Sequence, residues 1–413
     1  MRSLHLVSIF VLFIIGSCHS DKSKQIFKTG IWRAELTLDI QKSIKLPFNF
    51  TLKKIDSGNE IEIINASERI QLNNIVIQKD SIFIKFPIYD SEIKAKIQGT
   101  MLIGTWFNYA KSIDYSIPFV AYHNQDYRFK KRGNTNNSLN GKWETVFNSG
   151  TDDVYEAIGK FNVNENKLTG TFLTETGDYR FLDGIATMDS MFLSCFDGAH
   201  AFLFTAEISF DTVLKGTFWS GKHSKETWVA YKNENAQIGN PDSLTYLISK
   251  NNTIEFVYPN VDNEMISLND NRYNNKVVLV QIMGTWCPNC IDESKYLKSL
   301  YDEYNDDGLE IIAIAFEKAR NLEKAKENIR KYKKTLSIPY EVLLADINSS
   351  KSKTSDQFLT LNKIISYPTL LYIDKNKTVR KIHTGFSGPG TGNYYKNFVE
   401  FNQIFIESLL KAS

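Results

Sequence analysis

The sequence predicts two fold classes in one chain of 413 residues, an all-β region followed by an α/β domain. Before Asn240 the chain is rich in alternating apolar and polar positions and in aromatic residues, and poor in helical periods. After residue 245, apolar strand-like runs alternate with amphipathic helical segments, which is typical of an α/β domain. A chain of this length has room for two or three domains.

The first seventeen residues resemble an export signal, with Arg2 before the apolar core Leu4–Ile15. This core is too short to span a bilayer. Ile15-Gly16-Ser17-Cys18 resembles a bacterial lipobox, which predicts removal of residues 1–17 and lipidation of Cys18. Residues 18–27 would then form a lipidated tether, and two acyl chains suffice for stable anchoring in the cell envelope, facing the periplasm. The alternative is an ordinary signal peptide with an incidental cysteine.

A weak internal repeat divides the β-rich region into two units, residues 28–124 and 138–233. Three landmarks recur in the same order: Gly30-Ile31-Trp32 as Gly141-Lys142-Trp143, 80–84 as 189–193, and Gly104-Thr105-Trp106 as Gly216-Thr217-Phe218. The repeat predicts a duplicated antiparallel sandwich or barrel.

Alternation along one strand of each unit predicts which side chains are buried. Ile82, Ile84 and Phe86 should face inward. Cys195 aligns with Phe86 in the repeat, so we expect a buried core cysteine rather than a reactive thiol.

Residues 234–244, which include Pro241, predict a linker before an α/β domain over 245–413. Within that domain the expected elements are a hairpin, two buried strands and three amphipathic helices. They are, in order, Phe256–Leu268, Val277–Ile282, the helix after Cys290, Leu309–Phe316, a helix marked by Ala325, Ile329 and Tyr332, and a final helix at Tyr394–Leu410 after the loop Gly385–Gly392.

Cys287 and Cys290 stand directly after an apolar strand and directly before a helix. The helix buries one face through Leu297, Leu300, Tyr301 and Tyr304. Two thiols at this spacing form a small reversible disulfide, and helix amides stabilise the first sulfur as a thiolate. Pro288 suits a first helical turn. We therefore expect Cys287 to be the exposed attacking thiol and Cys290 the resolving thiol.

A pair of cysteines can also bind a metal or form a permanent disulfide. A structural zinc site needs a second ligand pair, and the sequence has none nearby, so no metal is expected there. An inert disulfide and a soft copper(I) site remain open alternatives. A peroxiredoxin pattern would need proline and threonine where this chain has Val280 and Gly284.

With Trp286-Cys287-Pro288-Asn289-Cys290 and the run SYPTLLYID at 366–374, residues 245–413 resemble the thioredoxin-like thiol-disulfide oxidoreductases of the TlpA/ResA type. The resemblance implies a central mixed sheet flanked by helices and a cis peptide bond before Pro368. It also places Tyr367 beside the site, and Trp286 and Pro288 would shape it. The alternatives are a trans proline opening an edge strand and a tryptophan packed in a turn.

The resemblance also gives Glu293 a role, as the acid that moves a proton to or from Cys290. The alternative is a solvated glutamate in the first helical turn. Lys295 stands where the family usually has a proline, which puts a helix kink in doubt. The segment around His200 is similar to one in extended family members, although a hydrogen-bonded structural histidine is the simpler expectation.

These inferences predict a membrane-anchored enzyme that exchanges disulfides with exported client proteins, as a reductase recharged by a membrane thiol donor of the DsbD/CcdA type. No cofactor is expected, and a net charge of +2 gives no case for nucleic acid. Two alternatives stay open: a client- or ligand-binding protein in which the thioredoxin-like domain is a scaffold, and a copper-delivery protein. The residues between the two cysteines do not fix the direction of exchange.

Overall fold

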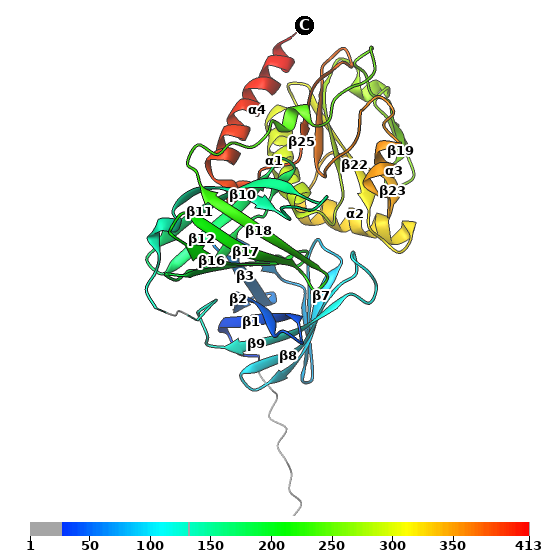
Figure 1. The fold of residues 1–413 in the computed structure, drawn as a ribbon. Helices are drawn as coiled ribbons and strands as arrows, with labels where there is room; N and C mark the ends of the chain where they lie inside the picture. The colour runs from blue at the N-terminus through cyan, green and yellow to red at the C-terminus, as the bar shows by residue number, and fades with distance from the viewer. Residues whose placement is uncertain (1–26, 131–132, 413) are drawn as a thin grey trace, which may run out of the picture.

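The computed structural model describes residues 27–130 and 133–412, so the expected export signal and Cys18 lie outside the described residues. Figure 1 shows the α/β domain at one end of the molecule, above the two β-rich units. The second unit lies against this domain, and the first unit also bonds to it, through the carbonyls of Phe86 and Pro87. Both β-rich units are barrel-like, which decides between the two architectures that the repeat predicts.

The first unit, called barrel 1, is a nine-stranded antiparallel sheet in the order β4-β3-β2-β1-β9-β8-β7-β6-β5. Its strands are β1 (Gly30–Asp39), β2 (Ile44–Ile55), β3 (Gly58–Asn65), β4 (Glu68–Leu72), β5 (Ile75–Gln78), β6 (Ser81–Lys85), β7 (Ser91–Gln98), β8 (Met101–Asn108) and β9 (Ser116–His123). Ile82, Ile84 and Phe86 are buried in its core, as predicted. Phe27, the last residue of the expected tether, also packs there, 5.3 Å from the ring of Trp32.

The second unit, barrel 2, has the order β11-β10-β18-β17-β16-β15-β14-β12-β13, and a further pairing of β11 with β12 closes it. Its strands are β10 (Gly141–Phe147), β11 (Tyr155–Asn164), β12 (Lys167–Thr174), β13 (Gly177–Asp178), β14 (Leu182–Ala186), β15 (Ser190–Phe196), β16 (Ala201–Ser209), β17 (Val213–Ser220) and β18 (Ser224–Lys232). Cys195 lies in its aromatic core with no exposed surface, and burial raises its pKa, so it is a buried core thiol.

The repeated landmarks occupy equivalent strands of the two barrels. Gly30 and Gly141 open β1 and β10 with the same φ of 109°, a conformation that favours glycine. Two residues later, the indole Nε1 of Trp32 and that of Trp143 each donate to a carbonyl four residues earlier, both at 2.9 Å. The same local geometry at both starts accounts for the repeat in the sequence.

The C-terminal domain has a five-stranded mixed sheet in the order β23-β22-β21-β24-β25. The strands are β21 (Val277–Met283), β22 (Leu309–Glu317), β23 (Glu341–Ile347), β24 (Thr369–Ile373) and β25 (Val379–Thr384). A small hairpin of β19 (Val257–Pro259) and β20 (Met265–Ser267) precedes them. The helices are α1 (Pro288–Tyr304), α2 (Leu322–Leu336), α3 (Lys351–Ser355) and α4 (Asn393–Lys411).

Alternate residues of β21 supply two cores. Val277 and Leu279 pack with α1, α2 and α4 on one face of the sheet. Val278 and Val280 pack with the hairpin and with Phe358 on the other. Strand β21 is therefore buried on both faces, which explains why it is apolar except at Gln281. No helix within 27–130 or 133–412 is long and apolar enough to cross a membrane.

Candidate functional site

The dithiol lies where β21 ends and α1 begins. Cys287 is the N-cap of α1, and its Sγ accepts a hydrogen bond from the backbone N–H of Cys290 at 3.4 Å. Cys290 has no exposed surface and Cys287 is only 8% exposed. The prediction that Cys287 is exposed was wrong, because barrel 2 covers the start of α1.

The two thiols differ in acidity. Burial raises the pKa of Cys287, but hydrogen bonds from Cys290 and from the backbone of Asn289, together with the charge of Arg180, outweigh burial and hold it below its usual value. Burial and the negative neighbour Cys287 raise the pKa of Cys290 well above its usual value. Cys287 is therefore the sulfur that this site favours as a thiolate.

Glu293 lies one turn beyond Cys290 and has no exposed surface, so the solvated alternative is wrong. Its Oε2 accepts from the amide of Gln281 at 2.8 Å, whereas Oε1 has no hydrogen-bond partner. Burial raises the pKa of Glu293 to about 8, and the negative charge of Cys287 adds to the rise. A carboxyl group in this state can hold or release a proton near neutral pH.

The loop before β24 forms the other side of the site. The Tyr367–Pro368 peptide bond is cis, the geometry that the family resemblance implies. Cys287 Sγ lies 3.6 Å from the carbonyl oxygen of Tyr367. The indole of Trp286 packs edge-on against the Tyr367 ring, donates to the carbonyl of Phe316 at 2.9 Å and carries the ammonium of Lys318 over its face.

Glu317, at the end of β22, is a second buried acid that the sequence analysis missed. It accepts from both the backbone N–H and the hydroxyl of Thr285, at 2.8 and 2.7 Å. Burial raises the pKa of Glu317 to about 7. Its bonds hold the loop between β21 and Cys287. In the sequence, this residue could have been recognised as an acidic side chain at the carboxyl end of a buried parallel strand, where sites in α/β folds commonly lie.

Barrel 2 supplies the outer wall of the site. A pocket of about 240 Å³ borders Cys287. From the C-terminal domain it is lined by Trp286, Pro288, Asn289, Ser366 and Tyr367, and from barrel 2 by Thr174, Thr176, Gly177, Asp178, Tyr179, His200 and Phe202. His200 is hydrogen-bonded to Asp197 at 3.2 Å, as expected for a structural histidine, and also faces this pocket. The site is therefore composite.

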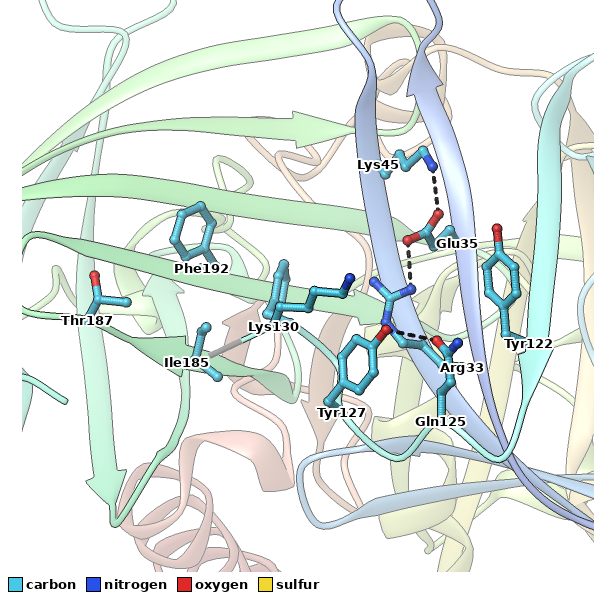
Figure 2. A pocket seen from close by; sticks show the side chains of 11 residues that line it. Arg33, Glu35, Lys45, Tyr122, Gln125, Tyr127, Lys130, Ile185, Thr187 and Phe192 are labelled. Carbon is cyan, nitrogen blue, oxygen red and sulfur yellow. Dashed lines mark hydrogen bonds and ion pairs between the residues drawn. The ribbon is translucent and has the colours of Figure 1, made fainter. Parts of the chain in front are cut away.

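A larger cavity of about 520 Å³ lies elsewhere, at the seam between the two barrels. Figure 2 shows Glu35 held between Arg33 and Lys45, with Tyr127 beside Arg33. No cysteine lines this cavity. Among the described residues, no group of three or more His, Cys, Asp or Glu side chains is placed to hold a metal ion.

The mixed sheet, the dithiol at the start of α1 and the cis proline define the C-terminal domain as thioredoxin-like. Residues 245–382 match the model of the family described as AhpC/TSA. Two thiol-disulfide oxidoreductases named ResA are similar. The one from Geobacillus thermodenitrificans is 30% identical over 131 residues, which covers 32% of this chain and 66% of that protein. The one from Geobacillus kaustophilus is 29% identical over 113 residues, covering 27% and 57%.

The chain thus spans less than two thirds of the length of these curated relatives. Among solved structures, a thiol:disulfide interchange protein of the thioredoxin family from Chlorobium tepidum is 20% identical, covering 38% of this chain and 94% of that one, with a TM-score of 0.28. On the sequence matches and the site, the C-terminal domain has a thioredoxin-like fold and is similar in sequence to thiol-disulfide oxidoreductases of the ResA type.

Proposed function

We propose that this protein is a thiol-disulfide oxidoreductase of the cell envelope that exchanges disulfides with exported client proteins through Cys287 and Cys290. The observation that carries the proposal is the difference between the two thiols. The helix start lowers the pKa of Cys287, whereas burial raises that of Cys290. An attacking and a resolving thiol need this difference.

In the reducing direction, the Cys287 thiolate attacks one sulfur of a client disulfide, and the other client sulfur leaves as a thiolate and takes up a proton. Cys290 then loses its proton, for which buried Glu293 is the nearby acceptor, and attacks Cys287 Sγ. This step releases the second client thiol and leaves a Cys287–Cys290 disulfide. A membrane dithiol donor of the DsbD/CcdA type would return both cysteines to thiols and be oxidised in turn.

Capture of clients by the Cys290→Ser variant tests the proposal. This variant can form the mixed disulfide at Cys287 but cannot resolve it, so clients should remain attached until a reductant is added. We expect reductant-sensitive adducts on the full-length chain, mapped to Cys287 by mass spectrometry. If no adduct forms in the envelope fraction, or if adducts map to Cys195, the proposed function is wrong.

The membrane anchor is part of the proposal and rests on the sequence around Cys18. Replacing Cys18 by alanine should release the protein into the soluble exported fraction, because the core Leu4–Ile15 is too short to hold it in a bilayer. Fractionation followed by immunoblotting measures this release. Unchanged membrane association of the Cys18→Ala variant would rule out the lipid anchor.

A further inference from the structure

Arg180, between β13 and β14 of barrel 2, connects all three parts of the molecule. Its side chain is only 4% exposed and is surrounded by three carboxylates. Nη2 pairs with Glu68 of barrel 1 at 2.6 Å, and Nε lies 3.2 Å from Asp197 of barrel 2. Nη1 pairs with Asp292 of α1 at 2.6 Å. One guanidinium thus ties both barrels to the helix that carries the dithiol.

The segment that leads into Arg180, residues 174–180, lies directly on the site. The carbonyl of Asp178 accepts from the Asn289 amide at 3.3 Å, next to Cys290. The carbonyl of Thr176 accepts from the hydroxyl of Ser366 at 3.1 Å, next to Tyr367. The segment therefore contacts both α1, which carries the dithiol, and the loop that contains the cis peptide bond before Pro368.

The contact at residue 177 leaves no spare room. Gly177 has a φ of 143°, and a Cβ there would come within 2.5 Å of the Asn289 amide nitrogen. The positive φ favours glycine here, and any other residue would also displace the Asn289 side chain. The close fit explains why Cys287 is 8% exposed and is reached through a pocket of about 240 Å³.

We propose that Arg180 is a positioning residue of the dithiol site: its ion pair with Asp292 seats residues 174–180 over Cys287. With the segment in this position, Cys287 can react with disulfides that have no bulky groups around them. Disulfides on broad folded surfaces cannot reach it. The inference rests on the proposed function for its meaning, since it names the class of disulfide that the site accepts. The positioning role itself is argued from the contacts of Arg180 and does not depend on the proposed function.

Two variants separate the effect of charge on the pKa of Cys287 from the effect of the ion pair on the position of residues 174–180. The ionisable groups that interact with Arg180 are Glu68, Asp197, Asp292 and the buried Tyr89. The ionisable groups that interact electrostatically with Cys287 include Arg180, Lys318, Cys290 and Glu293. Arg180→Gln removes a positive charge and should raise the pKa of Cys287. Asp292→Asn removes a negative charge and should not raise it. Both substitutions break the same ion pair, so both should loosen the segment.

The test compares two reagents on the reduced full-length protein: small iodoacetamide and a maleimide that carries a polyethylene glycol chain. Labelling at Cys287 is read by peptide mass mapping. We expect the ratio of polymer to small-reagent labelling rates to rise about tenfold or more in both Arg180→Gln and Asp292→Asn. Glu68→Gln is the matched control, because its pair with Arg180 does not involve α1, and should leave the ratio near that of the wild type.

The midpoint pH of iodoacetamide labelling should move up in Arg180→Gln and should not move up in Asp292→Asn. An unchanged ratio in the folded Asp292→Asn protein, or an equal rise in Glu68→Gln, would overturn the inference. If Arg180→Gln fails to fold, Asp292→Asn still decides, since it keeps the other two pairs. Labelling needs no disulfide exchange, so absent client capture would count against the proposed function alone.

Discussion

Replacing Cys287 by serine should abolish reduction of insulin disulfides by the full-length chain, lowering the rate at least about a thousandfold. A serine hydroxyl does not ionise near neutral pH, and no other thiol within residues 27–130 and 133–412 is placed to replace Cys287. Cys290 and Cys195 have no exposed surface, and their pKa values are raised. Insulin turbidity with excess dithiothreitol measures the rate.

Cys195→Ser is the matched control for this loss. The change keeps the size of the side chain and removes a thiol that lies in the core of barrel 2, so the rate should stay within a few-fold of the wild type. Equal losses in the Cys195→Ser and Cys287→Ser proteins, both still folded, would show that the account names the wrong thiol.

Glu293→Gln should remove a large pH dependence of stability. The folded-state pKa of Glu293 is about 8, against 4.5 for the free side chain. As the pH rises above about 4.5, the unfolded chain loses this proton while the folded chain keeps it, so the folded state loses stability until the pH passes about 8. A difference of this size corresponds to about 3–5 kcal/mol.

The measurement is the denaturation midpoint at about pH 5 and about pH 9 for wild type and variant. The wild-type midpoint should fall more steeply between the two, because glutamine has no proton to lose. Glu317 and Asp178, whose pKa values are also raised, titrate in both proteins and cancel in the comparison. Glu323→Gln, on the exposed side of α2, should behave as wild type. Parallel pH dependences in wild type and Glu293→Gln would show that the buried carboxyl ionises freely.

The parts of the fold that local patterns encode could be predicted from the sequence. The apolar run at Val277–Ile282 and the periodic positions after Cys290 predict the strand and helix that hold the dithiol, and β21 and α1 lie there. The repeated Gly-x-Trp starts predict two similar β-units, and the barrels share that geometry. Each signal lies within a few residues of what it predicts.

The covering of the site could not be predicted in this way. Arg180 meets Asp292 and Glu68 across 112 residues in either direction, and nothing periodic marks a pair so far apart. The position of Cys287 at a helix start predicts an exposed thiol, and only the tertiary structure shows that barrel 2 covers it. The contact of Thr176 with Ser366, across 190 residues, could not be predicted for the same reason.

The central claim is that Cys287 attacks and Cys290 resolves, and the labelling rates of the two thiols test it most directly. The reduced full-length protein is treated with iodoacetamide across a range of pH, and each cysteine is followed by peptide mass mapping. We expect Cys287 to react at neutral pH at least about tenfold faster than Cys290, with a labelling midpoint lower than that of an unperturbed cysteine. Equal rates, or faster labelling of Cys290, would contradict the account.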